Sequence, residues 1–416
     1  MPDAALMASR DAVLHIAQAA LAAVQGQTRV AEFLRATPLP EAVQLIAIGK
    51  AAASMATGAC DVLGERVVRG LIVTKTGHED VALERRPGFQ CLEAGHPQPD
   101  ARSLTAGAAL LAFIAEAPAS APLLFLVSGG ASSLVEVLPD GITLDDLQRA
   151  NTWLLGSGLD IAAMNTVRKA LSAIKGGRLL AHLQGRPAQV LLISDVRGDD
   201  PAVIGSGLLA ADSGAPHLEE LALPPWLAQL CRQAPPHRDA VPANVEMHVI
   251  ARLADAKRAA AREATMLGYS VVVHDEFIGG AANTAGQRLA QSLFHAASGV
   301  HIWGGETTVL LPPKPGRGGR NQSLALAAAL ALQGHEGVVL LALGSDGSDG
   351  PTEDAGALVD GGTVACGELA GLDARHCLAS ADAGSFLEQS GDLVHTGPTG
   401  TNVMDLVIGL KTWGVT

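Results

Sequence analysis

Glycine, serine and aspartate gather in loops that follow short apolar runs at five places in the chain. The five segments are LIAIGK (45–50), LLFLVSGGASS (123–133), VLLISDVRGDD (190–200), VHIWGGETT (300–308) and LLALGSDGSDG (340–350). Backbone N–H groups in such loops bind phosphate, and aspartates bind divalent cations. Two cations, Lys50 and Arg320, stand beside glycines. These residue types favour a ligand that carries phosphate and a metal over an apolar ligand.

The apolar runs themselves predict strands that are buried on both faces, because hydrophobic residues do not alternate with polar ones. Such strands are typical of parallel sheets, in which ligands bind outside the carboxyl ends of the strands. The first of these strands is predicted over 43–48, and further strands over 70–74, 89–92, 245–250 and 269–275. Helices are predicted over 3–24, 101–116, 161–183, 252–267, 281–297 and 321–333. The alternation predicts an α/β fold with a doubly wound sheet.

The chain has 416 residues, more than one hydrophobic core usually supports, so we expect two α/β domains with the active site in the cleft between them. Six prolines lie between residues 213 and 243 and are expected to interrupt regular structure. The domains are therefore predicted to span residues 1–235 and 236–416.

Composition and charge exclude several classes of protein. Hydrophobic residues make up 48% of the chain and charged residues 17%, which is typical of a compact enzyme. The formal net charge of −13 argues against nucleic acid or an anionic membrane as partner. The five cysteines include no CxxC pair, and no segment resembles a signal peptide or a membrane span. We expect a soluble, cytoplasmic protein with free thiols.

Several common motifs for nucleotides and metals are absent or weak. Gly49-Lys50 lacks the upstream glycine and the following Ser or Thr of a Walker A loop. The segment GSGLLA (205–210) matches the dinucleotide pattern GxGxxA but follows a poor candidate for a buried strand. The histidines and cysteines lack zinc-ligand spacing. Magnesium stays open, because one or two aspartates suffice to hold it beside a phosphate.

Two segments could bind an anion, and each has a plainer interpretation. The loop SGGASS (128–133) offers successive backbone N–H groups and three hydroxyls, but it could be an ordinary strand-to-helix turn. In NTVRKALSAIKGGR (165–178), helical spacing places Arg168, Ser172 and Lys175 on one face and Lys169 opposite the apolar stripe. That face could be solvated, or it could meet an anionic ligand.

Aspartates end two of the apolar runs. Asp195 follows one run, and Asp346 and Asp349 share a glycine-rich turn after another. Such residues could be turn residues or helix caps, or they could face a metal or a substrate hydroxyl. Arg320 is predicted at a helix N-terminus, where a planar cation and N–H groups suit a phosphoryl or carboxylate group.

Seven ordered motifs together resemble the glycerate 2-kinase family, which is also labelled as hydroxypyruvate reductases of tartrate breakdown. They are GHPQPDARS (95–103), LVSGGASSL (126–134), NTVRKALSAIKGGRL (165–179), SDVRGDDPAVIGSG (194–207), GRGGRNQ (316–322), GSDGSDGPTEDAGA (344–357) and TGPTGTNVMDL (396–406). The resemblance implies a Rossmann-like three-layer N-terminal domain and a second α/β domain characteristic of the family. It also implies phosphorylation of D-glycerate to 2-phosphoglycerate by ATP with Mg²⁺.

Carried over by position, the resemblance implies that Lys50, Arg320 and Asp195 are catalytic. We further predict that nucleotide phosphates contact Ser128, Gly129, Gly130, Ser132, Ser133, Asn165 and Lys169. Arg168 and Asp346 are predicted to contact substrate, and Asp195 and Asp349 to hold the metal. A homodimer is left open. The alternatives are an NAD(P)H-dependent hydroxypyruvate reductase and a non-catalytic sensor of sugar acids.

Overall fold

Two compact units make up the protein. The computed structural model describes residues 4–39, 42–78, 80–157, 159, 161–210, 218–233 and 244–412. One unit, called here the parallel unit, comprises Gly26–Ala251, and the other, the mixed unit, comprises Met1–Gln25 and Arg252–Thr416. The first helix of the chain therefore packs with the C-terminal residues. The domain boundary predicted between residues 235 and 236 lies outside the described residues and stays a prediction.

The parallel unit is built on a six-stranded, fully parallel sheet with the strand order β3-β2-β1-β4-β5-β6. The strands are β1 (Val43–Ile48), β2 (Val67–Lys75), β3 (Phe89–Ala94), β4 (Leu123–Val127), β5 (Ala188–Ile193) and β6 (Val245–Ala251). This is the Rossmann order, which reverses between β1 and β4 and leaves a ligand-binding crevice at their carboxyl ends. The predicted Rossmann-like fold is confirmed.

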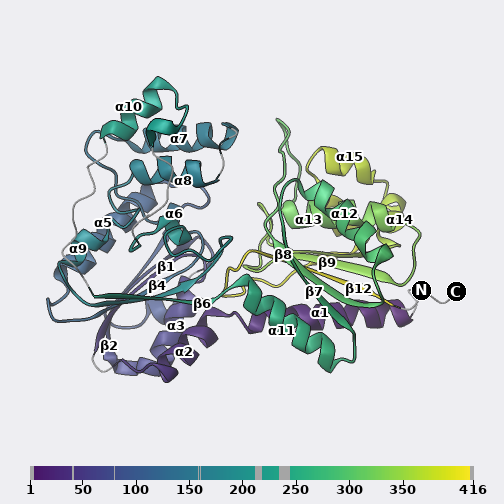
Figure 1. Ribbon diagram of the computed structural model, residues 1–416, viewed down its shortest axis with the longest axis horizontal. Helices are drawn as coiled ribbons and strands as arrows, with labels where there is room; N and C mark the ends of the chain where they lie inside the picture. The colour runs from purple at the N-terminus through teal and green to yellow at the C-terminus, as the bar shows by residue number, and fades with distance from the viewer. Residues whose placement is uncertain are drawn as a thin grey trace. The chain divides into compact units, whose positions relative to one another are not determined.

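Helices cover both faces of this sheet, so the unit has three layers. Figure 1 shows α2 (Gly26–Ala36) and α3 (Ala52–Leu63) on one side, and α5 (Ala101–Glu116) and α8 (Ile161–Ala170) on the other. The remaining helical segments are α4 (Val81–Glu84), α6 (Ala131–Leu134), α7 (Leu144–Gly156), α9 (Leu180–Leu183), α10 (Pro225–Gln233) and the 3₁₀ turns Gly64–Arg66, Ile204–Ser206 and Leu218–Glu220. Strands β1, β4 and β5 are buried along their whole length, which explains their unbroken apolar sequences.

The helix predicted over 161–183 is wrong for residues 171–179, which separate α8 from α9. The Ser172 hydroxyl accepts hydrogen bonds from the N–H groups of Ile174 (3.3 Å) and Lys175 (3.2 Å). A serine that bonds to nearby backbone offers the chain an alternative to the helix. The N–H of Ala173 donates instead to the carbonyl of Val137 at 2.7 Å. The chain thus leaves α8 at Ala170 and turns toward Val137, in the segment that follows α6.

The proline-rich stretch is also not devoid of regular structure. Helix α10 begins at Pro225, inside the segment that was predicted to be irregular. Proline is favoured at the first helical position, because its missing N–H would have no partner there. Whether prolines prevent a helix therefore depends more on their position in it than on their number.

The mixed unit has a six-stranded sheet with the order β11-β10-β9-β12-β8-β7. Its strands are β7 (Val271–Ile278), β8 (Gly299–Gly305), β9 (Val338–Gly344), β10 (Gly356–Asp360), β11 (Leu393–Val394) and β12 (Asp405–Lys411). Only β7 and β8 pair in parallel among these strands, so the parallel arrangement expected for this region is wrong. Strand β12 is antiparallel to both of its neighbours, β8 and β9. Consequently β8 and β9 point the same way, and their carboxyl ends reach one edge.

Helices also flank this sheet on two sides. Figure 1 shows α1 (Ala4–Ala22) and α11 (Leu253–Met266) on one side, and α12 (Ala282–His295) and α13 (Arg320–Leu332) on the other. The shorter helices are α14 (Thr363–Leu369), α15 (Ala374–Ala379) and α16 (Ala383–Ser390). A buried hydrophobic cluster, which includes Trp303 and Phe386, fills the space between the sheet and α13. The two-domain α/β class predicted from the sequence is confirmed.

Candidate active site

In the parallel unit, the loops after β1 and β4 are bonded to each other at the point where the strand order reverses. The N–H of Lys50 donates to the carbonyl of Gly129 at 2.9 Å, and the Ser128 hydroxyl accepts from the N–H of Ala51 at 3.0 Å. Lys50 and the SGGASS loop come from motifs that are about eighty residues apart in the sequence. The fold brings them together because β1 and β4 are neighbours in the sheet.

Two side chains lie beside Gly130 in this loop. Its φ of 86° lies in the left-handed region, which favours glycine. A Cβ atom at this position would lie 3.1 Å from Cγ of Lys50 and 3.1 Å from Cδ2 of His96. Lys50 and His96 therefore flank Gly130. His96 was not predicted as a site residue, although its motif, GHPQPD, was part of the resemblance.

A third loop, residues 202–207, closes around the same region. The hydroxyls of Ser132 and Ser206 are 2.6 Å apart, and Lys169 donates from Nζ to the carbonyl of Ala202 at 2.9 Å. Lys169 is buried, with 7% of its surface exposed. Gly205 lies in a 3₁₀ turn, and no helix starts directly after it. The GSGLLA segment therefore lacks the strand–loop–helix context of a dinucleotide site.

The predicted basic face of Arg168, Ser172 and Lys175 does not exist as such. Lys175 forms an ion pair with Glu136, and both side chains are almost fully buried, at 3% and 0% exposed. The Ser172 hydroxyl donates to the same carboxylate at 2.5 Å. Because α8 ends at Ala170, before Ser172 and Lys175, the Lys175 side chain turns inward. Lys175 therefore stabilises the fold and does not face a ligand.

Arg168 and Asn165 remain neighbours on α8. Arg168 donates from Nε to the Asn151 side-chain oxygen at 3.1 Å and from Nη1 to that of Asn165 at 3.4 Å. Burial lowers the pKa of Arg168 below its ordinary value.

Asp195 is half-buried and follows Ser194 at the end of β5, which pairs with β4. Since parallel strands end at the same edge, Asp195 lies at the same edge as Ser128.

In the mixed unit, the candidate site is centred on Arg320, the first residue of α13. Its Nε and Nη2 donate to the two carboxylate oxygens of Asp405, at 2.6 and 2.9 Å. Its Nη1 donates to Glu306 at 2.7 Å. Asp405 opens β12 and is paired with Gly305 of β8 and Gly344 of β9, so it lies between the two strand ends. The fork geometry fixes the plane of the guanidinium.

Charge around Arg320 keeps it protonated. Burial alone lowers the pKa of Arg320, but the attraction of Asp405, its hydrogen bonds and the attraction of Glu306 outweigh burial and raise the pKa above its ordinary value. Neither carboxylate was predicted from the sequence. The available signals were the motifs that contain them, TNVMDL for Asp405 and GGETT for Glu306.

Asp349 caps the helix that carries Arg320. Its two oxygens accept from the N–H groups of Asn321 (3.0 Å) and Gln322 (2.7 Å). A Cβ on Gly319 would lie 2.4 Å from the Asp349 carboxyl carbon, so the close approach requires glycine there. Burial raises the pKa of Asp349 to about 7, and the charge of Asp405 adds to this, while the two N–H groups oppose it.

The remaining predicted aspartate of the turn, Asp346, is also buried. Its Oδ1 accepts from the N–H of Ser348 at 3.0 Å and from the Ser348 hydroxyl at 3.2 Å. Across the described part of the chain, no group of three or more His, Cys, Asp or Glu side chains is placed to hold a metal ion. The two predicted metal ligands, Asp195 and Asp349, belong to different units.

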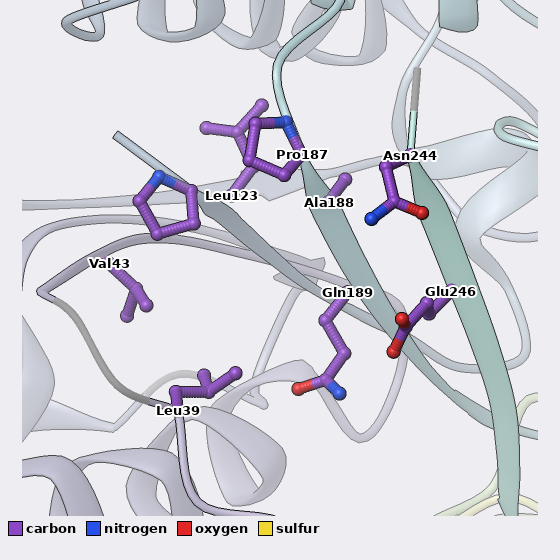
Figure 2. A pocket seen from close by; sticks show the side chains of 9 residues that line it. Leu39, Val43, Leu123, Pro187, Ala188, Gln189, Asn244 and Glu246 are labelled. Atoms are coloured by element: carbon purple, nitrogen blue, oxygen red, sulfur yellow. The ribbon is translucent and has the colours of Figure 1, made fainter. Parts of the chain in front are cut away.

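A cavity of about 360 Å³ in the parallel unit is unrelated to these loops. It is lined by residues at the amino ends of strands, including Val43 of β1, Leu123 of β4 and Ala188 of β5 (Figure 2). The candidate site loops follow the carboxyl ends of the same strands. The cavity therefore lies at the opposite edge of the sheet from the candidate site.

Within each unit, the structure brings some of the predicted residues together. Lys50, the SGGASS loop and Lys169 are brought together in the parallel unit. In the mixed unit Asp349 caps the helix that begins at Arg320, and Asp346 lies in the same turn as Asp349. Joint action of Lys50 and Arg320 on one ligand stays a prediction. Among the described residues, no helix combines the length and apolar content needed to cross a bilayer.

Comparisons with known proteins agree with this architecture. Residues 12–221 match the family described as a domain of unknown function, DUF4147, and residues 299–405 match the MOFRL family. The chain is 37% identical to D-glycerate 2-kinase of Thermotoga maritima, over 88% of this chain and 90% of that protein. It is 34% identical to glycerate 2-kinase of Pyrococcus horikoshii, over 89% and 87% of the two chains.

A solved structure extends the match to three dimensions. The crystal structure of glycerate kinase from Thermotoga maritima superimposes with a TM-score of 0.83 at 36% identity, and covers 98% of this chain and 100% of that chain. Sequence motifs, strand order and overall superposition therefore agree, and the chain belongs to the glycerate 2-kinase family.

Proposed function

We propose that the protein transfers the terminal phosphoryl group of ATP to the C2 hydroxyl of D-glycerate, giving 2-phosphoglycerate. The observation that carries this proposal is the bonding of the Lys50 loop to the SGGASS loop at the reversal of a Rossmann sheet. Anionic cofactors bind at this point in open α/β sheets. The printed activity of the relatives, glycerate 2-kinase, supports the same reaction.

Phosphoryl transfer asks a protein mainly to align the reactants and to neutralise charge on the transferring group. In our proposal, Lys50 and the loop from Ser128 to Ser133 hold the nucleotide phosphates. Lys169 keeps the 202–207 loop against them through Ala202, and Arg168 with Asn165 lies on the same helix. Asp195, at the adjacent strand end, accepts the proton of the acceptor hydroxyl or holds the metal.

Arg320 is proposed to neutralise the second anionic group of the reaction, either the transferring phosphoryl group or the substrate carboxylate. Its guanidinium is fixed by Asp405, so little ordering is needed when the ligand arrives. Asp346 is proposed to contact the substrate. These roles come from the charge and placement of the side chains within each unit.

Magnesium is the proposed metal, and Asp195 is the carboxylate that fits it. Both oxygens of Asp349 already accept backbone N–H bonds at the start of α13, which leaves this side chain poorly suited as a ligand. Magnesium is commonly held by one or two carboxylates together with substrate phosphates and water. When bound, it would neutralise phosphate charge beside the Lys50 loop.

A coupled assay of ADP release tests the reaction type. We expect ADP to form from ATP only when D-glycerate is added, and NADH to be stable when the protein is mixed with hydroxypyruvate. The placement of Gly205 in a 3₁₀ turn argues against a dinucleotide site and hence against the reductase. Consumption of NADH without release of ADP would overturn the proposal, and binding of glycerate without turnover would favour the sensor.

Cytoplasmic location and a homodimer complete the proposal. All five cysteines are free thiols, which is typical of proteins in a reducing compartment. Light scattering of the purified protein measures the assembly state directly. A mass near twice that of the 42.4 kDa chain is the expected result for a homodimer, and a single-chain mass would exclude it.

A further inference from the structure

The two carboxylates that bind Arg320 differ in how firmly they are held. The Asp405 side chain is 5% exposed, receives two bonds from the guanidinium, and belongs to a strand that is paired on both sides. The Glu306 side chain is 45% exposed, receives one bond from the guanidinium, and follows the end of β8. Exposed single ion pairs contribute little to stability, whereas buried fork-shaped pairs are costly to break.

The charges around Arg320 do not favour an incoming anion. One guanidinium faces two carboxylates, and the helix cap Asp349 lies close enough to add to its field. An anionic ligand that approached Nη1 would therefore meet an excess of negative charge. It can gain this cation only if a carboxylate yields its place, and Glu306 is the more exposed of the two and receives a single bond from the guanidinium.

We propose that Glu306 is a displaceable counter-ion of Arg320. The anionic ligand takes the place of Glu306 at Nη1, while Asp405 holds the guanidinium in position. The inference rests on the proposed function in one respect, that Arg320 meets an anionic group of the reaction. The group has phosphoryl or carboxylate oxygens, so its source is ATP or D-glycerate. Glu306 then acts as a specificity residue that excludes weakly charged competitors.

Removing the charge of Glu306 tests this role. Glu306→Gln keeps the size of the side chain but removes the competing charge, so the affinity for the displacing ligand should rise about two- to fivefold, the range expected for loss of an exposed ion pair. Calorimetry with ATP and, separately, with D-glycerate identifies the source, because only the ligand that displaces Glu306 gains affinity. The KM for that ligand should fall while kcat stays within about twofold.

The chain supplies a matched control. Arg317 also binds one buried aspartate, Asp354 (12% exposed), and one exposed glutamate, Glu388 (54% exposed). Glu388→Gln removes an equivalent exposed pair, and both KM values should be unchanged. Asp405→Asn, which disturbs the fixed partner, should instead lower kcat by at least about tenfold without any gain in affinity.

Two results overturn the inference. Unchanged or weakened binding of both ligands to Glu306→Gln would show that Glu306 is not displaced, and a loss of kcat as large as in Asp405→Asn would make it a fixed positioning residue. Arg320→Ala keeps these failures separate from failure of the proposed function. If Arg320→Ala turns over normally, the role of Arg320 itself is wrong, whereas its loss of turnover leaves the Glu306 result to decide.

Discussion

The two units carry their functional residues at the same kind of place, the carboxyl ends of buried strands, but with opposite charge. At the edge of the parallel unit, Lys50 lies against glycine and serine loops, and Lys169 anchors a third loop nearby. At the edge of the mixed unit, Arg320 is surrounded by Glu306, Asp349 and Asp405.

This difference teaches how one overall acidic chain can act on two anions. The parallel edge gathers basic and hydroxyl groups and can hold a polyphosphate, which needs several donors. The mixed edge has a single cation that is already paired, so it discriminates between anions more than it attracts them. The nucleotide is therefore expected at the parallel edge, and the predictions below test this division.

Loss of Lys50 should have the largest effect. Lys50→Ala removes the cation beside the SGGASS loop, so kcat/KM should fall by about 10³-fold or more, because charge stabilisation carries most of phosphoryl transfer. The melting temperature should change little, since the side chain is not part of the buried core. Steady-state kinetics checks this, and near-normal turnover would remove Lys50 from the site.

Lys175 should behave in the opposite way. Lys175→Met leaves Glu136 as an unpaired buried charge, so the free energy of unfolding should fall by about 3 kcal/mol. Turnover per folded molecule should be unchanged, because Lys175 is structural. Urea denaturation measures the loss, and the double variant Lys175→Met with Glu136→Leu should recover most of it. Normal stability of the single variant would contradict the assignment.

At the mixed edge, geometry should matter as well as charge. Arg320→Lys keeps the positive charge but cannot form the fork with Asp405, so kcat should fall by about 10²-fold. A matched change at Arg317, Arg317→Lys, should leave kcat unaltered. If Arg320→Lys were fully active, the fixed guanidinium plane would have no importance.

Asp349 should have the smallest effect on turnover, because its role is to cap α13 and its signature is the pH dependence of stability. Its pKa of about 7 in the folded protein is above its ordinary value of 3.8, so the folded state binds this proton more tightly. Stability from this group is present at low pH and falls as the pH rises from about 4 to about 7. Relative to Asp349→Asn, the wild type should lose up to about 4 kcal/mol over this range, because each unit of pKa shift corresponds to about 1.4 kcal/mol. If the free energy of unfolding changed with pH in the same way in both proteins, the raised pKa of Asp349 would be excluded.

Most strands and their loops could be predicted from the sequence, because strands buried on both faces leave an unbroken apolar signal. Strand β4 and the SGGASS loop illustrate this. Strand β12 was missed although its residues are buried, since it lies next to a glycine-rich loop and ends near the C-terminus. Its antiparallel insertion between β8 and β9 depends on long-range pairing that no local pattern records.

The site was predicted by residue type but not by partner. Lys50 and the SGGASS loop were expected to follow strands, and they follow β1 and β4. Helical spacing misplaced Lys175, because Ser172 ends the helix early. Asp405 and Glu306 were missed, since their importance comes from contact with Arg320. A carboxylate that orients a cation leaves no local spacing for the sequence to reveal.

Proton-coupled phosphorus NMR of the product from ATP and D-glycerate tests the central claim most directly. If the protein phosphorylates the C2 hydroxyl, the new phosphomonoester signal splits into a doublet, because C2 carries one hydrogen. A triplet would place the phosphate on C3 instead, and no new phosphomonoester signal would contradict the kinase activity itself.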